Sequence, residues 1–285
     1  MSKQENLSLV RRALEEDLRG YGDVTSFWTV PESLQGEANI IAREELVLCG
    51  LHLAELVLRE VDETARFVAL ARDGELMKPS QPVARLQGAA RSILTAERTM
   101  LNFLSHLCGI ATISRQFAEV VKELPVKVVD TRKTTPGLRT WEKYAVLCGG
   151  CENHRYGLFD MVLIKNNHIA AVGGVTEAVH RVKEKCPHTM KIEIEVENAD
   201  DLRAALAAGA DIVMLDNRSP EELKELVQLA RSIKPDVVLE ASGGVTKENV
   251  RAIAESGVNI VSTSAITMGA PAANLSLRIR DSITV

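Results

Sequence analysis

The second half of the chain alternates between short apolar runs and amphipathic segments. The short runs are typical of buried strands, and the segments between them repeat apolar residues at helical spacing. Strands that alternate with helices in this way predict a parallel sheet, either open or closed into a barrel. The predicted strands are residues 126–130, 160–165, 190–196, 211–215, 237–241 and 258–262, and the predicted helices are residues 175–185, 199–208, 219–231 and 246–256.

Residues 1–105 follow a different pattern, in which strands and helices come in mixed order. A helix is predicted to end before Gly20, because leucine and valine recur there at helical spacing, and the loop 20–26 follows it. A break at Gly109 divides the last apolar segment into two predicted helices. The other predicted elements are strands at 36–43, 65–72 and 82–86, a helix at 50–60, and the two helices at 92–106 and 110–123.

Composition and charge narrow the classes of function. The 285 residues carry 34 Lys and Arg against 39 Asp and Glu, a net charge of −5, which argues against nucleic acid or an anionic membrane as the main partner. No stretch approaches the 18 apolar residues of a membrane span, and the acidic first 20 residues do not form a signal peptide. Five scattered cysteines predict a reduced, cytoplasmic setting.

Polar residues follow almost every predicted strand of the second half. In an α/β barrel the carboxyl ends of the strands form one rim, and that rim is where ligands bind. A single polar loop of this kind is as often solvated as functional, but six in register predict a site. The residues at these strand ends include Thr131, Arg132, Lys133, Lys165, Asp216, Asn217, Ser242, Gly243, Gly244, Ser262, Thr263 and Ser264.

Three glutamates alternate with apolar residues in the strand 190–196 and just beyond it. Glu193, Glu195 and Glu197 therefore share one face, which in a closed barrel points inward. Buried carboxylates need a partner or a metal, and Glu195 with Asp216 at the mouth suits Mg²⁺. The alternative is an exposed polar face on an edge strand.

Cations gather around the same rim. Arg132, Lys133, His154, Arg155 and Lys165 together predict an anionic ligand, because so many positive charges repel each other unless an anion joins them. The stretch Ser242–Gly244 ends a strand and opens a helix, which suits a phosphate. The loop 262–269 is a second small-residue loop at the usual phosphate position of a barrel. A salt-bridged surface and an ordinary glycine-rich turn are the alternatives.

These motifs carry a resemblance to a known family. Residues 130–168, DTRKTTPGLRTWEKYAVLCGGCENHRYGLFDMVLIKNNH, resemble the signature block of quinolinate phosphoribosyltransferase, also called nicotinate-nucleotide diphosphorylase (carboxylating), a type II phosphoribosyltransferase. The similarity extends over nearly the whole chain. It includes GDVTS at 22–26, TAERTMLNFLSHLCGIAT at 95–112, IEIEVEN at 192–198, IVMLDN at 212–217 and EASGG at 240–244.

The resemblance implies a fold and an activity. The implied α/β fold has an N-terminal α/β sandwich domain, residues 1–105 completed by about 270–285, and a partly open α/β barrel, residues 106–269. Enzymes of this family are pentosyltransferases of NAD biosynthesis. They transfer phosphoribosyl from phosphoribosyl pyrophosphate to quinolinate with decarboxylation, and they release nicotinate mononucleotide, pyrophosphate and CO₂.

The resemblance also implies a role for each site residue. Lys133, Glu195 and Asp216 would be catalytic, with Lys133 on phosphoribosyl pyrophosphate and the two carboxylates on its ribose hydroxyls and Mg²⁺. The 5′-phosphate would bind Ser242, Gly243 and Gly244 together with Thr263, Ser264 and Ala265. Quinolinate would bind Arg132, His154, Arg155 and Lys165, and Arg98 would reach the site of a second subunit, so a homodimer or higher oligomer is expected.

Two segments depart from the family pattern. Cys151 stands where family members often have glycine, and in the loop 264–271 Ser264 and Met268 replace a frequent glycine and a frequent histidine. We interpret this loop as a tuned phosphate or pyridine pocket. No role of a histidine is carried over to position 268.

Four alternatives remain open on the sequence. The enzyme could be a paralogue that uses nicotinate or another pyridine, or a phosphosugar aldolase in which Lys165 forms a Schiff base. It could also be a pyridine-sensing protein without turnover. A structural zinc at Cys148, Cys151 and His154 would modify any of these, although a second C-x-x-C is missing.

Overall fold

The structure, a computed structural model, describes residues 3–280, and it divides into two compact units. Unit 1 comprises residues 3–115, 138–150 and 270–280, and unit 2 comprises residues 116–137 and 151–269. The predicted domain limit at residue 105 falls inside a continuous helix, and residues 138–150, which the prediction assigned to the barrel, group with unit 1. Residues 281–285 of the predicted tail lie outside the described part of the chain.

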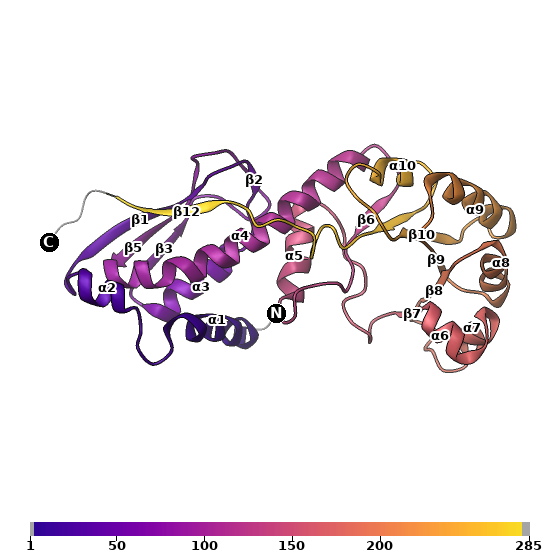
Figure 1. Cartoon of the computed structure of the whole chain (residues 1–285), viewed down its shortest axis with the longest axis horizontal. Helices are drawn as coiled ribbons and strands as arrows, with labels where there is room; N and C mark the ends of the chain where they lie inside the picture. The colour runs from indigo at the N-terminus through magenta and orange to yellow at the C-terminus, as the bar shows by residue number, and fades with distance from the viewer. Residues whose placement is uncertain (1–2, 281–285) are drawn as a thin grey trace. The chain divides into compact units, whose positions relative to one another are not determined.

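Unit 1 is built on a four-stranded antiparallel sheet with the strand order β12-β1-β5-β3. Along β1, Ala38, Ile40 and Ala42 are buried while their neighbours are half-buried, so one face of the strand packs on the core. Helices α1 and α3 contact each other, and α3 also contacts β3 (Figure 1). The strands are β1 (Gln35–Ala42), β3 (Arg66–Ala69), β5 (Pro82–Ala89) and β12 (Leu275–Ile279), with a separate pair β2 (Leu46–Val47) and β4 (Leu76–Met77), and the helices are α1 (Lys3–Leu18), α2 (Val24–Thr29), α3 (Leu51–Val61), α4 (Ala90–Val121) and α5 (Arg139–Gly149).

The prediction of two helices separated at Gly109 is wrong. Helix α4 runs without a break for 32 residues. Gly109 lies where the backbone of residues 271–272 crosses the helix, and a Cβ there would overlap the carbonyl oxygen of Pro271. The amide of Ala273 donates to the carbonyl of Ser105 (2.8 Å) at the same crossing. The glycine therefore permits a close approach of two backbones. In the sequence alone, a glycine kept for close packing looks the same as a glycine that ends a helix.

The loop predicted at residues 20–26 contains the start of helix α2. Asp23 is its N-cap, and the carboxylate accepts the amide of Ser26 at 3.0 Å. Thr95 of α4 donates to the other oxygen of Asp23 at 3.2 Å. The GDVTS motif therefore fixes the start of a helix and ties it to α4 within unit 1.

Unit 2 is built on a six-stranded parallel sheet, and all six predicted strands are confirmed. The strand order is β6-β11-β10-β9-β8-β7, and every recorded pair is parallel. Among the described residues, no pairing joins β6 to β7, so the sheet is not closed. The strands are β6 (Lys127–Val129), β7 (Val162–Ile164), β8 (Ile192–Val196), β9 (Ile212–Asp216), β10 (Val238–Ser242) and β11 (Ile260–Ser262).

Helices connect most of these strands, as Figure 1 shows in orange and yellow. The predicted helices are confirmed, although the last is only five residues long. A helix directly after β7 was not predicted. The helices of unit 2 are α6 (Asn166–Val172), α7 (Val175–Lys183), α8 (Ala199–Ala208), α9 (Pro220–Ile233) and α10 (Val250–Ala254).

The register of the sheet places polar residues in one row. Ser242 of β10 is paired with Asp216 of β9 on one side and with Ser262 of β11 on the other. Because the strands are parallel, their carboxyl ends lie at one edge of the sheet. The mixed α/β fold, with an N-terminal sheet domain and a C-terminal parallel-sheet domain, confirms the predicted fold class. None of the helices in residues 3–280 has both the length and the apolar character that a membrane span needs.

Candidate active site

A cavity of about 470 Å³ opens at the carboxyl ends of the strands in unit 2. A neighbouring cavity of about 260 Å³ shares Thr131, Lys133 and the loop 242–244 with it. Ten predicted site residues line the larger cavity: Arg132, Lys133, His154, Arg155, Lys165, Glu195, Asp216, Ser242, Gly243 and Gly244. Thr263, Ser264 and Ala265 line the smaller one.

Arg98 is not part of these cavities. It is an exposed residue of helix α4 in unit 1, whereas both cavities are lined by unit 2. Its predicted role in a second subunit stays a prediction.

The three glutamates of the β8 segment have different surroundings. Glu193 is fully buried and Glu195 is nearly so, as expected for inward-facing carboxylates. Glu197 follows the end of β8 at Val196, is exposed, and accepts a hydrogen bond from Asn166. The prediction that all three share the inner face is therefore wrong for Glu197, because the strand ends before it.

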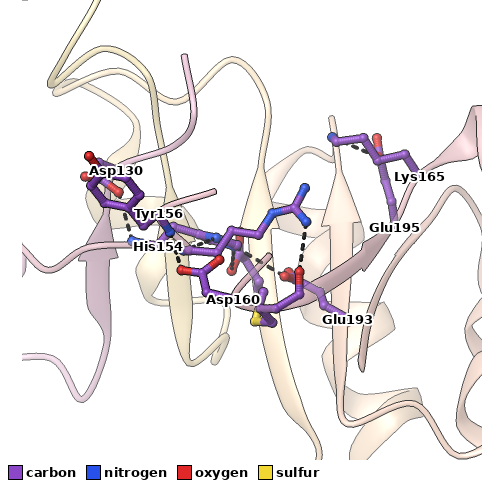
Figure 2. Close-up of polar contacts among 10 residues, drawn as sticks. Asp130, His154, Tyr156, Asp160, Lys165, Glu193 and Glu195 are labelled. Carbon is purple, nitrogen blue, oxygen red and sulfur yellow. Dashed lines mark hydrogen bonds and ion pairs between the residues drawn. The ribbon is translucent and has the colours of Figure 1, made fainter. Parts of the chain in front are cut away.

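Glu195 and Asp216 form an acidic pair at the cavity. Burial raises the pKa of Glu195; the nearby Lys165 ammonium opposes this shift, and the Asp216 carboxylate adds to it. Lys165 Nζ lies 3.4 Å from Glu195 Oε2 (Figure 2). Mg²⁺ prefers oxygen ligands, and two carboxylates on neighbouring strands beside a polar cavity can supply them. The residues therefore fit the predicted metal.

The backbone at Lys165 is fixed by a residue that the prediction did not assign to the site. The amide of Lys165 donates to Nδ1 of His168 at 2.9 Å, and the amide of His168 donates to the carbonyl of Lys165 at 2.7 Å. Lys165 is the N-cap of α6, so these two contacts fix the first turn of that helix. They set the backbone from which the Lys165 side chain reaches the cavity.

Two guanidinium groups face the same cavity. Burial lowers the pKa of Arg155, and the positive charge of Arg132 lowers it further. The Arg155 side chain is held by a hydrogen bond from Nη1 to the carbonyl of Met161 at 2.9 Å, and Asp160 accepts the amides of Tyr156 and Gly157 (Figure 2). Two guanidinium groups that line one cavity make it a site for an anion.

His154 contacts two buried glutamates beside the cavity. Its Nε2 lies 3.3 Å from Glu193 and 3.4 Å from Glu240. Burial alone would lower the pKa of His154, and the two carboxylates act against this effect. Burial also raises the pKa of Glu193, with His154 opposing and Glu240 adding to the shift.

Glu240 is a site residue that the sequence analysis missed. It is 1% exposed and lines the cavity from β10. Its signal in the sequence is an acidic residue inside the apolar strand 237–241, a position where an unpaired carboxylate would be costly. The resemblance included this glutamate in the EASGG motif without giving it a role.

The loop after β10 suits a phosphate group. Gly243 and Gly244 both have positive φ angles, +90° and +61°, and Asn217 beside them has a φ of +53°. A Cβ on Gly243 would overlap the side-chain amide of Asn217. The loop therefore depends on glycine, and glycine-rich backbone of this kind presents amide groups to anions.

The cysteines do not gather with His154. All five are free thiols, and Cys148 belongs to unit 1 whereas Cys151 belongs to unit 2. Among the described residues, the group that could hold a metal ion through histidine, cysteine or carboxylate atoms is His154, Glu193 and Glu240, without a cysteine. The zinc site at Cys148, Cys151 and His154 has no support from this geometry.

Comparison with known sequences places this architecture in a family. The sequence model of the quinolinate phosphoribosyl transferase C-terminal domain matches residues 110–278, and that of the N-terminal domain matches residues 23–108. The chain belongs to the quinolinate phosphoribosyl transferase family. The first match includes both cavities, so the candidate site lies within the part of the chain that defines the family.

Individual members of the quinolinate phosphoribosyl transferase family match over nearly their whole length. The nicotinate-nucleotide pyrophosphorylase [carboxylating] of Mycobacterium leprae is 42% identical over 260 residues, which cover 90% of this chain and 91% of that protein. The probable enzyme of the same name from Synechocystis is 41% identical over 245 residues, 86% of this chain and 83% of that protein. The solved nicotinate-nucleotide pyrophosphorylase of Francisella tularensis superposes with a TM-score of 0.92 at 41% identity and covers 98% of both chains.

Proposed function

We propose that this protein transfers phosphoribosyl from phosphoribosyl pyrophosphate to quinolinate with decarboxylation, and so makes nicotinate mononucleotide, pyrophosphate and CO₂ for NAD biosynthesis. The observation that carries the proposal is the joint placement of Arg132, Arg155 and Lys165 around one cavity. Three cations suit a ligand with two carboxylates. Membership of the family and the names of its relatives support the same activity.

The second substrate fits the other end of the site. The 242–244 loop and Thr263–Ala265 would take its 5′-phosphate, and Lys133 would contact its pyrophosphate. Glu195 and Asp216 would hold the ribose hydroxyls and a Mg²⁺ ion. A bound Mg²⁺ would neutralise charge on the pyrophosphate.

The chain's own residues then account for the chemistry. When the bond to pyrophosphate breaks, positive charge develops at the anomeric carbon, and the carboxylates of Glu195 and Asp216 are placed to stabilise it. Lys133 offsets the charge on the leaving group. Arg132, Arg155 and Lys165 hold quinolinate so that its ring nitrogen faces that carbon. The new cationic ring stabilises the electron pair left at C2 when the adjacent carboxylate departs as CO₂, and C2 then takes a proton from solvent to complete nicotinate mononucleotide.

The Schiff-base alternative is less well supported. A lysine that attacks a carbonyl needs an amine that is not engaged by another group, and Lys165 Nζ pairs with the carboxylate of Glu195 at 3.4 Å. This contact with Glu195 suits a Lys165 that binds a substrate carboxylate better than a Lys165 that forms a Schiff base.

We extend the proposal to assembly and location. An exposed Arg98 outside the cavities of unit 2 is suited to enter the site of a second copy, which would make the working unit a homodimer or a larger homo-oligomer. Five free thiols suit a reducing compartment such as the cytoplasm.

The test is a direct assay. Purified protein is incubated with phosphoribosyl pyrophosphate, Mg²⁺ and either quinolinate or nicotinate, and nicotinate mononucleotide and CO₂ are followed. We expect product from quinolinate alone. Product from nicotinate alone would show that nicotinate, and not quinolinate, is the substrate. Folded protein that forms no product with either compound would support a binding protein without turnover.

A further inference from the structure

A buried cluster of three titratable side chains lies beside the proposed quinolinate site. Glu193 comes from β8, Glu240 from β10, and His154 from the loop that follows α5. The two glutamates are 0% and 1% exposed, and the His154 side chain is 10% exposed. His154 and Glu240 line the cavity, so the cluster borders the space in which the substrate would bind.

Both ring nitrogens of His154 already face protein groups. Nε2 lies 3.3 Å from Glu193 and 3.4 Å from Glu240, and Nδ1 accepts the amide of Arg155 at 2.7 Å. The amide of His154 donates to Asp130 at 2.8 Å (Figure 2). The His154 ring could donate a hydrogen bond to a substrate carboxylate only if one of these contacts were broken.

The cluster has the composition of a metal site, but its hydrogen bonds oppose one. A metal would need the lone pair of Nε2, and the ring would then carry its proton on Nδ1. The amide of Arg155 points at Nδ1, so two donors would face each other across 2.7 Å. The arrangement instead keeps a proton on Nε2, between the two carboxylates.

Two carboxylates exceed what one N–H requires. Both carboxylate oxygens of Glu193 and Oε1 of Glu240 are buried and accept no hydrogen bond from any described residue, which is costly. The positive charge that offsets this excess is that of Arg155, whose guanidinium interacts with Glu193. Without nearby negative charge, Arg132 and Arg155 would repel each other in the free enzyme.

We propose that Glu193 and Glu240 are positioning residues for quinolinate binding: they hold the His154 ring, which in turn holds the backbone of Arg155, so that the Arg155 guanidinium meets one substrate carboxylate. His154 is then a positioning residue as well and does not bind the substrate through a ring nitrogen. This inference rests on the proposed function. It gives two residues without an assigned role a specific effect on one of the two substrates.

Kinetics of isosteric variants test the proposal. Glu240→Gln and Glu193→Gln keep the shape and remove the charge, and Glu225→Gln, an exposed residue of α9, is the matched control. We expect KM for quinolinate to rise about tenfold or more in the first two variants, because a displaced Arg155 loses a charge-assisted hydrogen bond to the substrate carboxylate. KM for phosphoribosyl pyrophosphate should stay nearly unchanged. An unchanged KM for quinolinate, or an equal rise in both KM values, overturns the proposal.

Nitrogen NMR of the wild-type protein provides a second test that needs no turnover and no variant other than His154→Gln for assignment. We expect the ¹⁵N shifts of the His154 ring to stay the same when quinolinate saturates the site, because neither ring nitrogen meets the substrate. A large shift of Nε2 or Nδ1 overturns the proposal, as does a stoichiometric metal that Glu240→Gln removes. A wild-type protein that does not bind quinolinate would instead overturn the proposed function.

Discussion

Gly243 and Gly244 are neighbours with positive φ angles, but a side chain would meet different surroundings at each. A Cβ on Gly243 would overlap the amide of Asn217 and lie 3.0 Å from its backbone nitrogen, whereas a Cβ on Gly244 would meet nothing within 4 Å. Only the first position therefore depends on glycine for packing as well as for its backbone conformation. The pair allows the shape of the phosphate loop to be tested one residue at a time.

We expect Gly243→Ala to raise KM for phosphoribosyl pyrophosphate by about tenfold or more, because the loop must move away from Asn217. Gly244→Ala carries only the strain of a left-handed backbone, about 1 kcal/mol, and should have the smaller effect. Steady-state kinetics with each substrate varied in turn measures both. Equal effects of the two variants would show that the Asn217 contact does not matter.

Arg132 carries the residue-scale prediction for the other substrate. Arg132→Ala removes one of two guanidinium groups at the cavity, so we expect KM for quinolinate to rise about a hundredfold. Arg203→Ala, on the exposed side of α8, is the control. Wild-type affinity for quinolinate in Arg132→Ala, measured by calorimetry, would contradict the assignment of this site.

At the scale of elements, helix α4 depends on a glycine that helix propensity alone would replace. Alanine is the better helix former, yet Gly109→Ala should destabilise unit 1 by about 1–3 kcal/mol, because its Cβ overlaps the carbonyl of Pro271. Gly36→Ala in β1 is the matched control, since its nearest contact would be an ordinary 3.5 Å. Urea unfolding of both variants gives the comparison, and a stabilised Gly109→Ala would refute the packing argument.

The start of helix α2 gives a second prediction at this scale. Asp23→Ala removes the cap and should cost about 1 kcal/mol, while Asp23→Asn keeps an acceptor oxygen and should cost less. Burial opposes the shift, but hydrogen bonds from Ser26 and Thr95 lower the pKa of Asp23 below its ordinary 3.8. The stabilisation is therefore full above pH 3.8 and is lost as the pH falls through the lowered pKa.

Urea unfolding at neutral pH and near pH 3 measures this contribution. The difference between wild type and Asp23→Ala should shrink at the lower pH. A difference that stays constant with pH would mean that the charge of Asp23 does not contribute.

At the scale of the whole molecule, the proposed oligomer can be tested by mixing two inactive variants. Arg98→Ala and Lys165→Ala each lack one part of the site, so a hybrid dimer contains one site with both parts if Arg98 acts in a second subunit. We expect each variant alone to be nearly inactive and the mixture to regain part of the activity. No recovery, in a mixture shown by native mass spectrometry to have exchanged subunits, would contradict the shared site.

The sequence by itself determined the parts of this protein that depend on local pattern. The six strands of unit 2 and the polar residues at their ends could be predicted, because apolar runs of strand length and the residues that follow them are contiguous in the chain. The parallel order of the strands then places Asp216, Ser242 and Ser262 in one row. Eight of the ten predicted site residues that line the larger cavity do so for this reason, and His154 and Arg155 reach it from the loop after α5.

Tertiary structure decided what depends on residues far apart in the chain. Gly109 has the signal of a helix break, but the crossing of residues 271–272 makes it a point of close packing. Glu197 continues the alternation of Glu193 and Glu195, but only the end of β8 decides that it is exposed. The contacts of His154 with Glu193 and Glu240 join three separate segments, and no local pattern contains such a contact.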